Sequence, residues 1–362
     1  MADGATAAAL PERILAHVPA VDDAVADTVA HLGSDLVDLD PALGAVAEAL
    51  ADAAAGGKRL RPALLCWSFA AHGGGDPARI LGPAVALELV HTCALVHDDV
   101  IDRTDARRGA PTVHARFAAR RTGADVTSEA AASHGRAVAI LLGDVALSAA
   151  DGELLAADVD PAALARAHAA FTRLRVEVMA GQFLDVDAAA RRGADRERAL
   201  RVATLKSARY SVGRPLELGA LRAGADDAAA TRRLTVGDPV GRAFQLRDDL
   251  LGVFGDPAVT GKPAASDLAE GKRTLLVAEA LARLDPAGRE TLEAGLGDPG
   301  LDTTGTERLR GLLEACGARA AVEAQLDAEL AAADAAIEAC GLDAAARADL
   351  RAVAAWAARR DA

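Results

Sequence analysis

Aromatic side chains are scarce in this sequence. Phe, Trp and Tyr together make up 2% of the 362 residues, although hydrophobic residues make up 51%. A buried core must therefore be built mainly from Ala, Leu and Val. Ala is the strongest helix former, and small side chains let helices approach one another closely. The composition therefore favours a large, all-helical fold.

Cysteine pairs and net positive charge are also lacking. The four cysteines (Cys66, Cys93, Cys316 and Cys340) are widely scattered, so neither a disulfide framework nor a zinc site is indicated, and we expect a reducing compartment. The formal net charge of −13 argues against a broad basic surface that grips nucleic acid. It does not exclude anionic substrates, because local Arg and Lys groups and divalent metals bind phosphates.

Signal-like and membrane-spanning segments are missing as well. The first residues, MADGATAAALPERILAHV, have no basic start followed by a long apolar run. The best candidate for a membrane-spanning segment, residues 137–150, is too short to cross a bilayer and is interrupted by Asp144. We therefore expect a cytoplasmic protein without membrane insertion.

Asp-Pro pairs recur along the chain and predict helix starts, because Asp is a favoured N-cap and Pro is favoured in the first turn. Pairs that are followed by long Ala/Leu-rich segments begin at Asp40, Asp76, Asp160, Asp238 and Asp285. No segment shows the β-branched alternation of a strand, and no repeat of fixed period stands out. We expect one domain of antiparallel helices over residues 1–362, with a surface loop at residues 122–134 and a charged turn at residues 191–198.

Residues 87–114, LELVHTCALVHDDVIDRTDARRGAPTVH, carry the first chemical pattern. In a helix that reaches Asp102, the carboxylates of Asp98 and Asp102 lie one turn apart on one face, with His91 two turns before Asp98. Paired carboxylates at this spacing suit Mg²⁺, which also keeps phosphate oxygens as ligands. Taken alone, the pattern is equally compatible with an acidic helix end that forms surface ion pairs.

Two groups of cations accompany this motif. Arg107 and Arg108 follow it directly and present forked donors that match phosphate. Upstream, residues 56–62 read GGKRLRP and place Lys58 and Arg61 at a predicted helix start, where free N–H groups and the helix dipole favour anions. A basic cap on a surface helix would have the same sequence.

A second acidic motif lies within residues 238–272, about 150 residues downstream of the first. Its polar residues are Gln245, Asp248 and Asp249 on one predicted helix, then Lys262 and Lys272 in the loop beyond. Between the two acidic motifs stand Gln182, Lys206 and Ser207. Each of these is a weak signal alone, because Gln and Lys on helices usually face solvent.

Together and in this order, these motifs resemble the trans-isoprenyl diphosphate synthases (polyprenyl synthetases), the family that includes farnesyl and geranylgeranyl diphosphate synthases. The resemblance covers residues 56–274. It implies a bundle of antiparallel helices around one deep cavity, usually in a homodimer. It also implies a Mg²⁺-dependent transferase that joins isopentenyl diphosphate to an allylic diphosphate.

The same resemblance implies a role for each motif residue. Asp98, Asp102 and Asp248 would bind Mg²⁺, with Asp99 beside them in the catalytic group. Arg107, Lys206 and Lys262 would hold the allylic diphosphate. Lys58, Arg61, His91 and Arg108 would hold isopentenyl diphosphate. Gln182, Ser207, Gln245 and Lys272 complete the expected substrate-binding residues.

The second motif departs from the family pattern at one position. Gly252 stands where the family usually has a third Asp, so one metal-facing carboxylate is missing from that helical face. Asp248, the expected principal ligand, remains, and Asp256 one turn further along is a candidate to compensate through water. We expect weaker Mg²⁺ affinity rather than lost activity.

Product length in such an enzyme is set by the depth of the cavity below the first motif. Cys93 and Ala94, the residues five and four before Asp98, are both small. Nothing there blocks growth at fifteen carbons, so we expect a C20 product, or a longer one if no other side chain closes the cavity floor. Trp67 and Leu87 are candidates for the cavity floor, and both would serve equally well as plain core.

Two other functions fit parts of the pattern. A terpene cyclase would share the fold and the acidic motifs. It would have no use for the second diphosphate site formed by residues 56–62 and His91. A non-catalytic regulatory subunit of a heteromeric synthase would explain Gly252, but not the complete first motif with both arginines.

Overall fold

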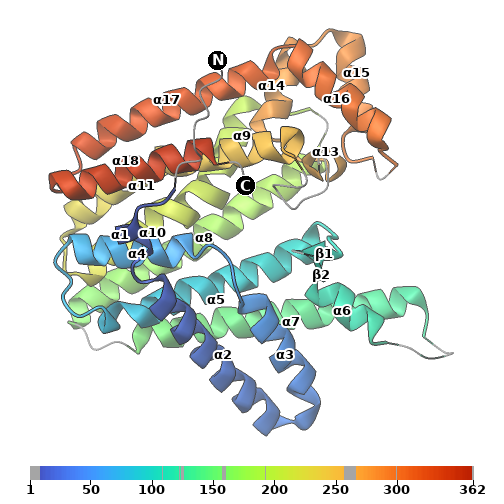
Figure 1. The fold of residues 1–362 in the computed structure, drawn as a ribbon. Coiled ribbons are helices and arrows are strands. Elements are labelled where there is room, and N and C mark those ends of the chain that lie inside the picture. The colour runs from blue at the N-terminus through green and yellow to red at the C-terminus, as the bar shows by residue number, and fades with distance from the viewer. Residues whose placement is uncertain are drawn as a thin grey trace.

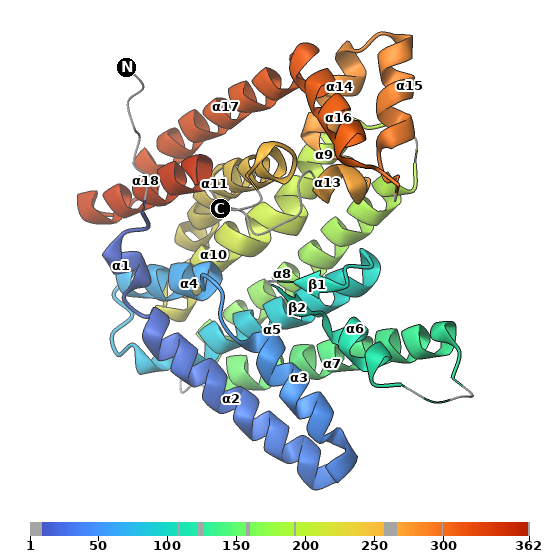
Figure 2. The same cartoon turned by 45° about the vertical axis from the view of Figure 1, so that its right-hand side comes forward.

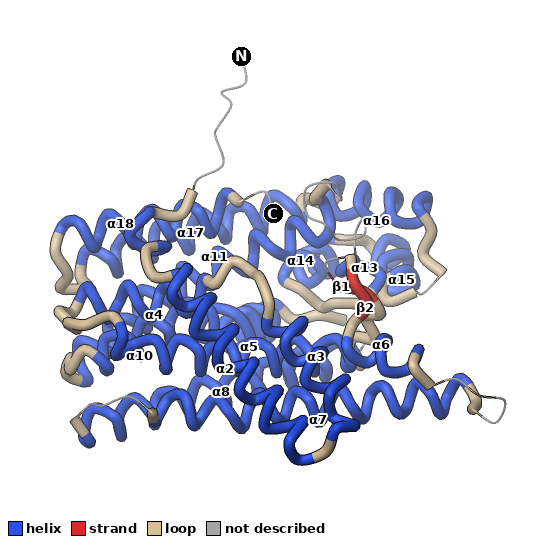
Figure 3. Tube along the Cα trace, turned by 60° about the horizontal axis from the view of Figure 1, so that its bottom comes forward, coloured by secondary structure: helices blue, strands red, loops and turns tan. Residues whose placement is uncertain are grey.

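The computed structural model describes residues 9–107, 109–121, 123, 126–156, 160–191, 193–256, 266–298 and 300–360. Helices make up most of these residues (Figure 3). The strands among them are β1 (Ala106–Arg107) and β2 (Ala110–Pro111), which pair antiparallel. The all-α fold that the composition predicts is therefore confirmed.

The described helices follow one another with short connections. In the first half of the chain they are α1 (Glu12–Leu15), α2 (Val18–Leu39), η1 (Pro41–Leu43), α3 (Gly44–Ala54), α4 (Leu60–Ala71), α5 (Ala78–Ile101), α6 (Val113–Ala119), α7 (Ser128–Leu155) and α8 (Pro161–Ala189). In the second half they are α9 (Arg196–Val202), η2 (Ala203–Gly213), α10 (Arg214–Arg222), α11 (Asp227–Phe254), α13 (Ser266–Ala269), α14 (Leu275–Arg283), α15 (Pro286–Gly295), α16 (Thr303–Ala315), α17 (Ala318–Glu338) and α18 (Ala344–Arg359).

Two long helices organise the bundle. Helix α5 packs against α7, α4 and α2, and α11 packs against η2, α10, α17 and α18. The α2–α3 pair projects at one end of the molecule, and α17 and α18 run side by side at the other (Figures 1 and 2). The carboxyl ends of α5 and α11 carry the two acidic motifs.

Helix starts are mostly where the Asp-Pro pairs predict them. The side chain of Asp160 accepts a hydrogen bond from Ala163 N at 2.9 Å and caps α8. The side chain of Asp285 accepts one from Gly288 N at 2.7 Å and caps α15. Such caps satisfy N–H groups that the first turn leaves without a partner.

The prediction of a helix start at Asp238 is wrong, because this pair lies inside α11. That helix is already capped by Asp226, whose side chain accepts from Ala229 N at 2.7 Å. Pro239 is buried within the packed helix, and Asp238 forms an ion pair with Arg209 instead of capping. Tertiary packing here outweighs the local preference of proline for a helix start.

The expected loop at residues 122–134 is also shorter than predicted. Helix α7 begins at Ser128, with Thr127 as its N-cap, so residues 128–134 are helical. The charged turn at residues 191–198 is shortened in the same way, because α9 begins at Arg196 after the N-cap Asp195. Both segments are polar, and polarity alone does not separate a loop from an exposed helix end.

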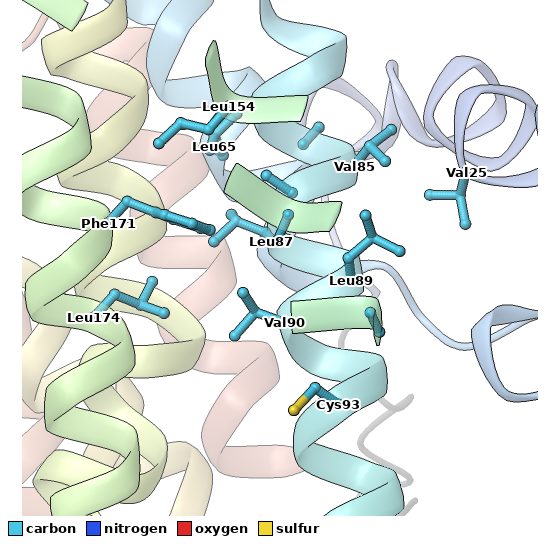
Figure 4. Packing of buried hydrophobic residues seen from close by; sticks show 14 of the residues in the cluster. Val25, Leu65, Val85, Leu87, Leu89, Val90, Cys93, Leu154, Phe171 and Leu174 are labelled. Carbon is cyan, nitrogen blue, oxygen red and sulfur yellow. The ribbon is translucent and has the colours of Figure 1, made fainter. Parts of the chain in front are cut away.

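Helix α5 is buried on almost every side. Among the described helices it is the one long and apolar enough to cross a membrane by length and composition, yet 67% of its most apolar window is buried inside the protein. The segment singled out from the sequence, residues 137–150, lies instead on α7. Leu87, Val90 and Phe171 pack together in the core that surrounds α5 (Figure 4). A helix that is covered by its neighbours is apolar on most faces, and α5 is therefore a core helix of the bundle.

Candidate active site

The first acidic motif ends α5. Asp102 is the C-cap of the helix, and its backbone N–H donates to Asp98 O at 2.8 Å. Asp98 lines an apolar pocket of about 330 Å³ that also includes Cys93 and Ala94. The helical reading of this segment is therefore confirmed, with Asp98 at the mouth of a cavity.

Asp99 points elsewhere and holds an arginine in place. It is buried, and its Oδ1 accepts a hydrogen bond from Arg107 Nε at 2.8 Å. The Arg107 guanidinium also lies within 4.0 Å of Asp98 Oδ2. Asp99 therefore positions Arg107 beside the pocket mouth.

Two further helices bring polar groups to Asp98. Gln182 Nε2 on α8 donates to Asp98 Oδ1 at 2.9 Å. Lys206 Nζ on η2 lies 3.4 Å from the same oxygen and 2.7 Å from Asp185 Oδ2. The sequence placed Gln182 and Lys206 among the candidate residues, and the structure brings both to the first acidic motif. Asp185 was missed as a partner of Lys206.

A close approach of α8 to η2 makes this arrangement possible. A Cβ atom at Gly181 would lie 2.4 Å from Lys206 N, so only glycine lets the two backbones meet here. Element η2 is a π-helix. Such wide turns are rare and occur frequently at functional sites.

The charges at the pocket mouth are crowded. Burial and the negative charge of Asp98 raise the pKa of Asp102 to about 6, although Lys272 and Lys206 act against this rise. Burial alone would lower the pKa of Lys206, but the carboxylates of Asp185 and Asp98 raise it. The mouth is therefore an environment that favours additional positive charge.

The second acidic motif lies on α11. Gln245 accepts a hydrogen bond from Ser207 Oγ and donates one to Asp249 Oδ1, the latter at 2.6 Å. Burial and the negative charge of Asp267 raise the pKa of Asp249 to about 8. Lys272 Nζ lies 2.6 Å from Glu270 Oε2 and contributes positive charge near Asp249.

Asp248 faces a different group. Arg360 Nη2 donates to Asp248 Oδ1 at 2.7 Å. Arg360 directly follows α18, and its guanidinium lies 3.8 Å from the centre of the Phe244 ring. No sequence motif pointed to Arg360, because an arginine near a chain end has no distinctive local pattern.

The residues 56–62 motif borders a second, more polar pocket of about 310 Å³. Lys58 Nζ lies 5.9 Å from the Trp356 ring centre, and burial together with the positive charge of Arg360 lowers the pKa of Lys58. The Arg61 guanidinium lies 4.3 Å from the centre of the Tyr210 ring. These cations converge on the pocket from α4, its preceding loop and the C-terminal helix.

Arg59 of that motif also lines the polar pocket, but its guanidinium is bound by carboxylates of other helices. Arg59 Nη1 donates to Glu88 Oε2 at 2.5 Å and Arg59 Nε donates to Asp22 Oδ1 at 2.7 Å. The guanidinium is buried and fixes the loop to α5 and α2. Arg59 adopts the left-handed backbone region, at φ 47°, which is uncommon for a residue other than glycine.

The two pockets are neighbours. Arg61, His91 and Leu95 line both of them. His91 Nδ1 lies 3.1 Å from the Tyr210 hydroxyl, which orients the imidazole between the pockets. The arrangement therefore places a polar, cation-lined pocket directly beside an apolar one that has carboxylates at its mouth.

Neither candidate for the cavity floor lines the apolar pocket. Trp67 Nε1 donates to Asp349 Oδ2 at 3.0 Å, and Trp67 packs in a core cluster that includes residues of α17 and α18. Leu87 lies deeper along α5 among Val90, Phe171 and Leu174 (Figure 4). Trp67 is therefore plain core, and Leu87 belongs to the packing beneath the cavity.

The carboxylates present fit a particular type of metal. Among the described residues, no group of three or more His, Cys, Asp or Glu side chains is placed to hold a metal ion. The acidic residues come as pairs on α5 and α11 instead. Pairs of carboxylates suit Mg²⁺, which keeps several waters and binds substrate phosphates, and do not suit a closed zinc site. Arg108 and Lys262 lie outside the described residues.

Comparison with known proteins gives consistent results. The family described as "Polyprenyl synthetase" matches residues 43–312. A solved geranylgeranyl pyrophosphate synthase from Corynebacterium glutamicum, complexed with isoprenyl diphosphate and magnesium, has a TM-score of 0.87 and 35% identity, over 97% of this chain and 100% of that chain.

Two curated relatives come from Mycobacterium tuberculosis. A (2E,6E)-farnesyl diphosphate synthase is 36% identical over 258 residues, which are 71% of this chain and 66% of the relative. A geranylgeranyl diphosphate synthase is 35% identical over 285 residues, which are 79% of this chain and 76% of the relative.

Proposed function

The chain belongs to the polyprenyl synthetase family, and from this premise we propose that it is a Mg²⁺-dependent prenyltransferase. Its substrates are isopentenyl diphosphate and an allylic diphosphate, and its product is a longer prenyl diphosphate. The observation that carries this proposal is the pair of adjoining pockets that share Arg61, His91 and Leu95. One pocket offers cations for a diphosphate, and the other offers apolar walls for a hydrocarbon chain.

Each diphosphate has a separate set of cations. Isopentenyl diphosphate binds in the polar pocket, where Lys58, Arg61 and His91 converge. The allylic diphosphate binds at the mouth of the apolar pocket, beside Lys206 and Arg107. By resemblance to the family, Arg108 joins the first set, and Lys262 and Lys272 join the second.

The reaction depends on charge. Asp98, Asp102 and Asp248 would hold Mg²⁺, which would supply positive charge and make the allylic diphosphate a better leaving group. Lys206 and Arg107 donate hydrogen bonds to the departing diphosphate as its negative charge develops. The apolar walls keep water away from the allylic carbocation until the double bond of isopentenyl diphosphate attacks it.

The last step is loss of a proton. Asp98 is the one carboxylate among the described residues that line the apolar pocket, and it is engaged with Gln182 and Lys206. We assign the proton to the departing diphosphate rather than to a side chain. This accounts for a site that is rich in cations but poor in general bases.

A C20 product is the most consistent length. Cys93 and Ala94, which line the apolar pocket, have small side chains and leave its space open. The volume of this pocket is about 330 Å³. Further along α5 the space is filled by the packing of Val90, Leu87 and Phe171 (Figure 4). Growth past C15 is therefore open, and growth well past C20 meets the core.

We extend the proposal to a cytoplasmic homodimer of single-domain subunits. Val176, Met179, Phe183 and Val186 are exposed on α8 and recur every three or four residues. An apolar stripe of this spacing is typical of a helix that pairs with another helix. Light scattering should give a mass about twice that of the 36.8 kDa chain.

A product assay tests the function directly. The purified protein is incubated with Mg²⁺, isopentenyl diphosphate and dimethylallyl, geranyl or farnesyl diphosphate separately, and the products are sized by mass spectrometry. We expect a prenyl diphosphate that ends at C20. The Asp98→Ala variant should retain its helical circular dichroism spectrum and lose turnover.

The other outcomes each identify a different function. A hydrocarbon or an alcohol would indicate a cyclase. Folded wild-type protein that elongates none of the primers would indicate a regulatory subunit. Near-normal turnover in Asp98→Ala would contradict the role of the first acidic motif.

A further inference from the structure

The backbone conformation at position 252 does not require glycine, because its φ angle is not positive. Gly252 lies inside α11, one turn beyond Asp248, in an ordinary helical conformation and fully within the packed face. Glycine in a helix interior costs about 1 kcal/mol relative to alanine. A reason for glycine at this position must therefore come from the space around it.

The carboxylate of Asp267 occupies that space. A Cβ atom on residue 252 would lie 2.1 Å from Asp267 Oδ2 and 2.5 Å from Asp267 Cγ. Both distances are far below van der Waals contact. Any side chain at position 252 and the observed position of Asp267 therefore exclude each other.

Asp267 is held firmly in this position. Its side chain is 7% exposed, and its Oδ1 accepts a hydrogen bond from Lys272 Nζ at 3.1 Å. Its backbone carbonyl accepts one from Lys272 N at 3.0 Å. The next residue, Leu268, is buried in the core beneath α11. The contacts with Lys272 and the burial of Leu268 therefore hold the carboxylate in place.

The charge of Asp267 acts on the same groups as the second acidic motif. Its negative charge contributes to the raised pKa of Asp249. Lys272, which it holds, interacts electrostatically with Asp102 of the first motif. By geometry, the Asp267 carboxylate lies against α11 at Gly252, one turn beyond Asp248 of the second motif.

We propose that Asp267 takes the place of the carboxylate missing at Gly252 and contributes to the Mg²⁺ site of Asp248. The inference rests on the proposed function, because it assumes that Mg²⁺ binds between the two motifs. The carboxylate acts on the ion directly or by accepting hydrogen bonds from its bound waters. Asp256, the sequence-based candidate for this role, is exposed beyond the end of α11.

The proposal makes an unusual prediction for the change that restores the family pattern. Gly252→Asp adds the usual third carboxylate, but it must displace Asp267 and should weaken Mg²⁺ binding. The double variant Gly252→Asp with Asp267→Gly removes the clash and should recover most of the affinity. Asp267→Asn keeps the shape of the side chain and removes its charge, so it tests the same role without overpacking.

The measurement is the Mg²⁺ concentration for half-maximal thermal stabilisation in the presence of saturating inorganic diphosphate. Asp267→Asn should raise this concentration about 10-fold or more, the usual effect of losing an outer-shell or direct ligand. Asp256→Asn, the matched control, should leave it unchanged. Asp267→Asn should also raise it when the change is made in a Lys272→Gln background, because the carboxylate then acts without its lysine partner.

Three results would overturn the inference. An unchanged Mg²⁺ requirement in Asp267→Asn would exclude Asp267 from the site. An equal rise in Asp256→Asn would assign the role to Asp256. No further rise when Asp267→Asn is added to Lys272→Gln would mean that Asp267 acts only by holding Lys272. Wild-type protein that is neither stabilised by Mg²⁺ with diphosphate nor active would overturn the proposed function as well, which separates the two failures.

Discussion

At the scale of single residues, the site keeps carboxylates in surroundings that penalise their charge. Asp102 and Asp249 are both partly or fully buried, and each lies close to another carboxylate. Their raised pKa values mean that ionisation destabilises the folded protein without metal. Function and stability therefore make opposite demands on these residues.

Asp102→Asn should make this conflict measurable. The pKa of Asp102 is about 6 in the folded protein against 3.8 for an unperturbed carboxyl, so the stabilisation by its proton is complete below pH 3.8 and is lost as the pH rises through 6. Asparagine cannot ionise. In metal-free buffer the variant should therefore gain about 2 kcal/mol on the wild type between about pH 4 and pH 7, while turnover is lost.

Thermal unfolding at several pH values in the presence of a chelator checks this expectation. Asp105→Asn is the matched control, because its side chain is 87% exposed on the neighbouring loop. A stability difference between Asp102→Asn and wild type that does not grow with pH would contradict it.

At the scale of secondary structure, the site depends on helices that approach very closely. Gly181 brings α8 against η2, and Gly241 brings α11 against η2, where a Cβ would lie 2.3 Å from Ala208 Cα. These approaches place Gln182 and Lys206 at Asp98, and Ser207 at Gln245. The π-helical turns of η2 let neighbouring residues serve both acidic motifs.

Gly181→Ala tests the close approach of α8 to η2. The added Cβ must push Lys206 away, so we expect a destabilisation of about 1–3 kcal/mol from overpacking and a fall in kcat. Gly152→Ala is the matched control, since Gly152 is helical in α7 with no neighbouring atom within 4 Å of its Cβ position. This control should stabilise the protein by up to about 1 kcal/mol. Equal effects of the two substitutions on turnover would argue against the approach as a positioning device.

At the scale of the whole molecule, the function depends on two pockets that different parts of the chain complete. The polar pocket combines the residues 56–62 segment with Phe244 on α11 and Trp356 on α18. The apolar pocket combines α5, α7, α8 and η2. A substrate pair can meet only because these elements enclose adjoining spaces.

Ala94→Phe tests the link between cavity depth and product length. The phenyl ring would project into the apolar pocket, and the main product should shorten from C20 to C15 while initial turnover with dimethylallyl diphosphate persists. Ala78→Phe is the control, because Ala78 is exposed at the start of the same helix. Mass spectrometry of the products decides the outcome. An unchanged product length would mean that the growing chain does not pass Ala94.

The sequence by itself determined the helical architecture and the placement of Asp98 and Asp102 on the same helical face. Both follow from local periodicity, since residues one turn apart share a face wherever the helix lies. Only the tertiary structure decided that Asp248 meets Arg360, that Arg59 binds Glu88, and that Asp267 fills the space at Gly252. These contacts join residues far apart in the chain, so no local pattern encodes them. The same reason explains why Pro239 lies inside a helix and why Trp67 belongs to the core: packing among several helices overrides the preference of one residue.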